Sequence, residues 1–211
     1  MFPEYIVLHT AAFTGRNCDR DMIDAWHKAR RWSGIGYHFV ILNDKHDLKP
    51  DGAVEVGRLT NKSGAHALGL NSCSLGICCV GHGDKVDFTP AQYKSLYNLI
   101  TDLMSEFSIS VDNVIGHREL NTLAEKNIIP SRYKTSKSCP GTKINMHAIR
   151  DKLAQTPTLI KHERTGVDEN SKIAMNNAIA ILQKHRAQFP NAQDELDEFI
   201  NHPEVISMTR A

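Results

Sequence analysis

Three side chains that could bind a metal ion lie far apart in the 211-residue sequence. His9 ends the apolar run "IVLH", His117 ends the run "VIGH", and Cys139 lies in the segment "KSCPG". Two imidazoles and a thiolate are a natural ligand set for zinc, and three protein ligands leave a fourth position for water. Cys139 could instead be a nucleophile with His117 as its base. The residues alone favour zinc but leave both interpretations open.

Each candidate also has an ordinary interpretation. The chain has 11 histidines, most of which must be surface or hydrogen-bonded core residues, and it lacks the HExxH and paired CxxC motifs. A lone lysine such as Lys137 is usually a solvated surface charge, and a strand tyrosine such as Tyr37 is usually half-buried. The five cysteines do not suggest a disulfide framework, because their number is odd and Cys78 and Cys79 are adjacent in an apolar run.

The strands that must position these residues are indicated by short apolar and β-branched runs. Such runs predict strands over residues 4–10, 35–42, 53–58, 74–81 and 113–117. The second and third runs are separated by a segment with Pro50 and the turn pair Asp51-Gly52, which predicts a hairpin with a long loop.

Helical periodicity fills the intervals between the strands. It predicts a helix capped by Asp19, a second helix with a capping box at Thr89 and Gln92, and a third over residues 145–153. We expect Trp26 and Trp32 in the core or at its edge. The fold class is therefore α/β, with a central mixed β-sheet flanked by helices and a C-terminal helical extension.

Composition limits the possible partners and the cellular location. Hydrophobic residues make up 41% of the chain and charged residues 23%, and the net charge is +1, so a partner that needs a basic surface, such as a nucleic acid, is disfavoured. No run of 18 apolar residues predicts a membrane span, and the N-terminus does not resemble a signal peptide. We expect a monomer that is made in the cytoplasm and needs another component to carry it elsewhere.

Seven motifs occur in an order that resembles the zinc-dependent N-acetylmuramoyl-L-alanine amidases of the type 2 family. They are "IVLHTAA", "WHKARRWSGIGYHFVI", "DGAVEVGR", "GAHALGLNSCSLGICCVG", "FTPAQYKSLYNLI", "VIGHREL" and "KSCPG". The family includes bacteriophage endolysins and is related to animal peptidoglycan recognition proteins. An ordered set of motifs is more specific than any single one. The resemblance covers about residues 4–153 and implies a catalytic domain over residues 1–156, with a helical extension of unknown role over 157–211.

The resemblance also implies roles for particular residues. His9, His117 and Cys139 would bind Zn²⁺, while Tyr37 and Lys137 would occupy the catalytic tyrosine and lysine positions of the family. Bound zinc would activate water, and the two catalytic side chains would assist the attack on the amide.

Further positions concern the substrate and one departure from the family. His66 and Asn71, in "AHALGLN", would lie along the substrate groove. Some members have a catalytic glutamate on the strand that matches "GICCVG", where this sequence has Cys78, Cys79 and Val80. The chain therefore resembles the tyrosine and lysine variety of endolysin rather than the glutamate variety.

The implied activity is hydrolysis of the amide between N-acetylmuramic acid and the L-alanine of the stem peptide in bacterial peptidoglycan, for host cell lysis. Release to the cell wall would then require a separate membrane-permeabilising protein. The same chemistry would suit a wall-degrading toxin delivered by a secretion machine. A non-catalytic peptidoglycan-binding module is disfavoured, because in that branch the metal-binding cysteine is typically replaced. A regulatory protein that binds a partner is the remaining alternative.

Overall fold

The structure is a computed structural model that describes residues 1–155, so the predicted extension over residues 157–211 lies outside the described part. Its five strands are β1 (Tyr5–Thr10), β2 (Phe39–Ile41), β3 (Val54–Val56), β4 (Ser74–Cys79) and β5 (Val114–Gly116). Its α-helices are α1 (Arg20–Ala29), α2 (Pro90–Phe107), α3 (Leu120–Glu125) and α4 (Met146–Gln155). Short 3₁₀ helices are η1 (Val111–Asn113), η2 (His117–Glu119) and η3 (Ser131–Tyr133).

The strands form one mixed sheet in the order β3-β2-β4-β1-β5, which confirms the predicted fold class. β2, β4, β1 and β5 are parallel, and β3 pairs antiparallel with β2 at the edge, as the predicted hairpin requires. β2 is shorter than the predicted strand over residues 35–42. The N–H of Gly36 donates to His27 Nδ1 of α1 at 3.0 Å instead of joining the sheet, so Gly36 does not extend the strand, which begins at Phe39.

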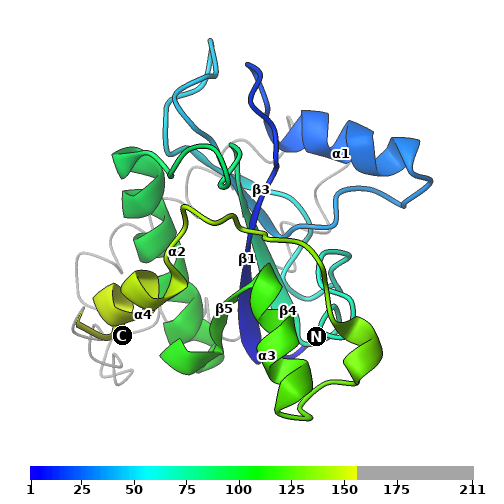
Figure 1. The fold of residues 1–211 in the computed structure, drawn as a ribbon. Coiled ribbons are helices and arrows are strands. Elements are labelled where there is room, and N and C mark those ends of the chain that lie inside the picture. The colour runs from blue at the N-terminus through cyan, green and yellow to red at the C-terminus, as the bar shows by residue number, and fades with distance from the viewer. Residues whose placement is uncertain (156–211) are drawn as a thin grey trace, which may run out of the picture. The chain divides into compact units, whose positions relative to one another are not determined.

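The two faces of the sheet pack against different helices (Figure 1). Ile6 and Leu8 of β1 lie in a core cluster with residues of α2 and α4, whereas Val7 lies in a cluster with residues of α3. Val40 and Cys78 lie in a third cluster with residues of α1. Because strand side chains alternate between faces, His9 lies on the face of Val7, toward α1 and α3.

The capping box at the start of α2 is present as predicted and helps to fix the sheet. The N–H of Gln92 donates to Thr89 Oγ1, and the N–H of Thr89 donates to Gln92 Oε1. Buried Gln92 also donates through Nε2 to the carbonyls of Ile41 and Val80, at 3.1 and 2.9 Å. One side chain therefore ties α2 to the carboxyl ends of β2 and β4.

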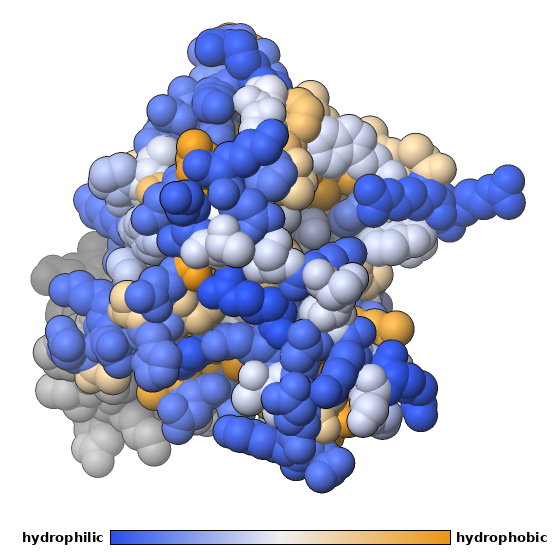
Figure 2. Space-filling view, in the orientation of Figure 1, coloured by the Kyte–Doolittle hydropathy of each residue, from blue (hydrophilic) through white to orange (hydrophobic). Residues whose placement is uncertain are grey.

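The face of the molecule that Figure 2 shows is mostly hydrophilic, with hydrophobic side chains in small separate patches. Among the helices of residues 1–155, none combines the length and the hydrophobicity that a transmembrane segment needs.

Candidate metal centre and active-site cleft

The two predicted histidines meet at the carboxyl edge of the sheet. His9 lies near the end of β1, and His117 begins η2 directly after β5, the parallel neighbour of β1. Their ring centroids are 4.8 Å apart, and the residues are only 2% and 8% exposed. Parallel pairing of the two strands therefore brings together imidazoles that are far apart in the sequence.

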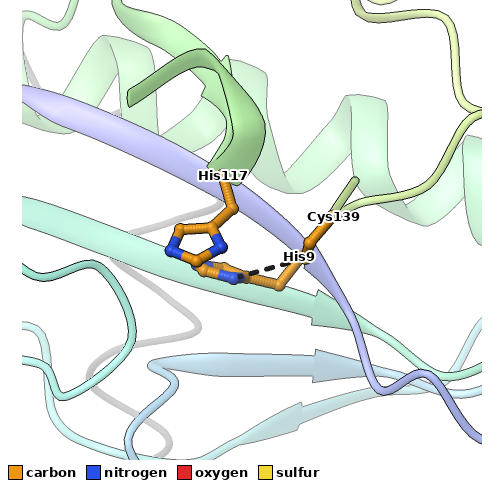
Figure 3. Close-up of side chains that lie close together, drawn as sticks. All are labelled: His9, His117 and Cys139. Carbon is orange, nitrogen blue, oxygen red and sulfur yellow. Dashed lines mark hydrogen bonds between the residues drawn. The ribbon is translucent and has the colours of Figure 1, made fainter. Parts of the chain in front are cut away.

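Cys139 completes the group from the loop between η3 and α4 (Figure 3). Its Sγ lies 3.7 Å from His9 Nδ1, and the N–H of Thr10 donates to Sγ at 3.4 Å. Two ligand atoms of a tetrahedral zinc ion are about 3.3–3.6 Å apart, given metal–ligand bonds of about 2.0–2.3 Å. The candidate atoms of His9, His117 and Cys139 all lie within 4.8 Å of one another, so small side-chain adjustments suffice. The donor set and its spacing fit a zinc ion, and the binding of zinc stays a prediction.

The protonation states favour metal binding over nucleophilic catalysis. Burial lowers the pKa of His117 to about 4, with a smaller contribution from Lys137, and burial also holds the pKa of His9 well below its usual range. Both imidazoles are therefore neutral at pH 7, the form that binds metal. Burial raises the pKa of the Cys139 thiol, whereas a nucleophilic cysteine needs a lowered pKa. A bound cation would remove the thiol proton outright.

Arg118 clamps the loop that carries Cys139. Its Nη1 donates to the carbonyls of Ser138 and Gly141 at 3.2 and 2.6 Å, and its Nη2 donates to Ile144 at 2.7 Å. Its backbone N–H also donates to the Cys139 carbonyl, at 2.7 Å. Because Arg118 directly follows one predicted ligand and binds the loop of another, it fixes their separation. Arg118 lies in the motif "VIGHREL", but its residue type and position do not by themselves predict this role.

Asp84 holds the same loop from the other side. Its carboxylate accepts from Ser138 Oγ at 2.6 Å and from the N–H of Thr142 at 2.7 Å, and these hydrogen bonds lower its pKa. In the described part of the chain, Asp84 is the one carboxylate that lines the cleft, and both its oxygens are engaged. Cys78 and Cys79, at the position of the family's glutamate, are fully buried.

A partly buried ion pair anchors the turn that presents His117. The Glu119 carboxylate accepts from the N–H of Gly116 at 2.7 Å and pairs with both terminal nitrogens of Arg150, at 2.9 and 3.0 Å. Arg150 belongs to α4, so this bidentate pair fixes η2 against that helix.

The two predicted catalytic residues both line the cleft. The ring centroid of Tyr37 is 5.0 Å from that of His9, and burial raises the pKa of Tyr37 well above its usual range, so its hydroxyl stays protonated. Lys137 is exposed at the rim, and its charge contributes to the lowered pKa of His9 and His117. Among residues 1–155 no carboxylate forms an ion pair with Lys137.

The two predicted substrate-groove residues belong to the loop between β3 and β4. His66 Nδ1 lies 3.1 Å from His9 Nε2, and burial lowers the pKa of His66 to about 3. Asn71 Oδ1 accepts from the N–H groups of His66 and Ala67, at 2.8 and 2.9 Å. Both residues line the cleft, and their contact with a substrate stays a prediction.

A cleft of about 720 Å³ opens over this centre, a size that suits a small-molecule or peptide ligand. It is lined by all seven residues that the resemblance singled out: His9, Tyr37, His66, Asn71, His117, Lys137 and Cys139. Trp26, Trp32 and Arg132 also line it, although the sequence analysis assigned them no site role. Trp26 packs against Phe13 at the core edge, as expected, whereas Trp32 is 40% exposed.

Comparison with known proteins gives concordant matches. The family model described as N-acetylmuramoyl-L-alanine amidase matches residues 1–142. The endolysin of Enterobacteria phage T3 is 39% identical over 114 residues, which are 51% of this chain and 71% of that protein. The endolysin of Escherichia phage T7 is 40% identical over 94 residues, 42% of this chain and 58% of that one. Among solved structures, the amidase LysC from Clostridium intestinale URNW aligns with a TM-score of 0.58 and 32% identity, over 72% of this chain and 86% of that one.

Proposed function

Because the chain belongs to the N-acetylmuramoyl-L-alanine amidase family, we propose that it cleaves the amide between N-acetylmuramic acid and the L-alanine of the stem peptide with zinc-activated water. Family membership makes it a hydrolase that acts on amide bonds. One observation supports the zinc mechanism above all others: the ligand atoms of His9, His117 and Cys139 lie within 4.8 Å of one another. The substrate is peptidoglycan or the muropeptides released from it.

Each of the proposed site residues would have its own role in the hydrolysis. His9, His117 and Cys139 would hold the zinc ion, which would supply water activated at neutral pH and polarisation of the scissile carbonyl. The Lys137 ammonium, which lines the cleft, would stabilise the negative charge that develops on the carbonyl oxygen. Tyr37, which stays protonated at neutral pH, would donate a hydrogen bond rather than accept a proton.

We assign this activity to a catalytic domain over residues 1–156 and treat residues 157–211 as an extension. The family match over residues 1–142 lies entirely within the first segment, which supports the division. The endolysin relatives support lysis of a host cell wall as the biological role. Ending the chain at residue 156 should leave hydrolysis of soluble muropeptides intact. A truncated protein that stays folded but loses this activity would contradict the division.

The proposal is tested by measuring zinc content and product identity together. The purified protein should contain zinc, and mass spectrometry of digested muropeptides should show free stem peptides that begin with L-alanine. His9→Ala, His117→Ala and Cys139→Ser should each lose both zinc and activity. His147→Ala is the matched control, because this histidine is exposed on α4 and does not line the cleft. A ligand variant that remains fully active without metal would refute the mechanism.

A further inference from the structure

We propose that His66 is a positioning residue of the metal centre, which accepts a hydrogen bond from His9 and thereby fixes the tautomer and orientation of that ligand. The inference rests on the proposed function, since it concerns a ligand of the proposed zinc ion. Its starting point is the contact of 3.1 Å between His66 Nδ1 and His9 Nε2, across 57 residues of sequence.

The direction of this hydrogen bond follows from the two nitrogens of His9. Nδ1 faces Cys139 Sγ at 3.7 Å, whereas Nε2 faces His66. A neutral imidazole carries one proton, and a metal shared with Cys139 needs the lone pair of Nδ1. The proton of His9 must therefore lie on Nε2 and point at His66 Nδ1, which has to be the acceptor. Metal-binding histidines commonly donate their second N–H to a neighbouring acceptor, which fixes the ring.

The His66 ring is held tightly enough to act as a fixed acceptor. It packs against two glycines: a Cβ atom added at Gly64 would lie 2.4 Å from His66 Cδ2, and one added at Gly76 would lie 2.6 Å from His66 Cγ. Side chains at either position would therefore displace the ring. His38 packs against it edge to face, with centroids 5.5 Å apart.

The groups around His66 are themselves fixed by the backbone. Asn71 Oδ1 holds the N–H of His66, and His38 Nδ1 accepts from the N–H of Gly76 at 2.9 Å. The other nitrogen of His38, Nε2, donates to the Lys62 carbonyl at 3.0 Å. The position of the acceptor is thus set by the fold before any substrate arrives. This distinguishes a positioning role from the substrate contact that the family resemblance implied.

The test compares three substitutions of His66 in the full chain by zinc competition with a chromophoric chelator. His66→Leu removes the acceptor at similar volume, and His66→Gln keeps polarity but moves the oxygen away from the Nδ1 position. His66→Asn places its Oδ1 near the former Nδ1. Loss of an outer-shell partner typically costs about 10- to 100-fold in metal affinity, so we expect this loss for the first two variants and recovery of most of the affinity with asparagine.

A spectroscopic readout and a control separate positioning from general damage. The absorption bands of the Co²⁺-substituted protein should shift for His66→Leu and His66→Gln and stay near the wild-type positions for His66→Asn. His82→Leu is the control for zinc affinity, because His82 lines the same cleft but makes no hydrogen bond to His9, His117 or Cys139 in the described structure.

The outcomes discriminate between the inference and the proposed function. Unchanged zinc affinity in His66→Leu or His66→Gln, with a raised KM, would assign His66 to substrate binding and overturn the inference alone. Equal losses in all three variants would show that the hydrogen-bond acceptor is not the cause, and would overturn it too. A wild-type chain that binds no zinc would instead overturn the proposed function.

Discussion

Replacing Arg118 with alanine should loosen the Cys139 loop and lower the stability of the protein. The guanidinium makes three hydrogen bonds to loop carbonyls, of which two are short, at 2.6 and 2.7 Å. A hydrogen bond to a charged group contributes about 1.5–3 kcal/mol. Because Arg118 is itself only partly buried, we take the lower end for the two short bonds. The expected loss is therefore about 3–4 kcal/mol, a large share of the roughly 5–15 kcal/mol that stabilises a domain.

Urea unfolding of the metal-free protein, followed by circular dichroism, measures this loss. Arg16→Ala is the matched control: Arg16 pairs with Asp47 at the surface, where the side chains are 67% and 48% exposed, so its loss should cost no more than about 1 kcal/mol. Arg118→Lys keeps the charge but not the forked donor geometry, and should recover less than half of the loss. Zinc affinity should fall in Arg118→Ala, because the thiol is no longer held beside His9. The clamp is refuted if Arg118→Ala matches Arg16→Ala in stability and the wild type in zinc affinity.

Three further perturbations test the roles of single side chains. Lys137→Ala should keep zinc and fold but lose roughly 100- to 1000-fold in kcat on purified muropeptides, and unchanged turnover would reject its role in stabilising charge. Tyr37→Phe keeps the aromatic ring and removes the hydroxyl, so kcat should fall while the zinc dissociation constant stays constant; equal kcat would exclude the phenol from catalysis. Burial alone would raise the pKa of Glu119, but hydrogen bonds from Arg150 and the N–H of Gly116 hold this pKa below 4.5. The ionised carboxylate therefore stabilises the fold above pH 4.5, and this contribution is lost as the pH falls through the folded-state pKa. Glu119→Gln should therefore be less stable than the wild type at pH 7, and urea titrations should show this gap narrowing as the pH falls below 4.5; a gap that does not narrow would contradict this.

Most of what the sequence could predict about the fold came from patterns among residues that are near one another in the chain. The capping box at Thr89 and Gln92 is visible in the sequence because its hydrogen bonds join residues three positions apart. The strands that end near His9 and His117 were indicated by apolar runs, and both residues lie at the carboxyl edge of the sheet. The metal-ligand set as a whole was named from the resemblance to a family, because spacing alone did not distinguish zinc from a nucleophilic cysteine.

The parts that the sequence analysis missed depend on contacts between distant segments. Arg118 and Asp84 hold the Cys139 loop largely through hydrogen bonds to its backbone. Every residue type has a backbone carbonyl, and every type except proline has a backbone N–H. No residue pattern in the loop therefore marks these partners. No sequence pattern indicates the contact between His66 and His9 either, since it depends on how the β3–β4 loop folds over Gly76.

The three proposed ligands enter the chain at very different times during synthesis. His9 precedes the thiol that would share its ion by 130 residues, and that thiol follows Lys137 by two positions. A nascent or prematurely terminated chain that stops before residue 137 thus has two imidazoles but neither the sulfur ligand nor the ammonium. On the proposed mechanism, such a fragment would lack hydrolytic activity.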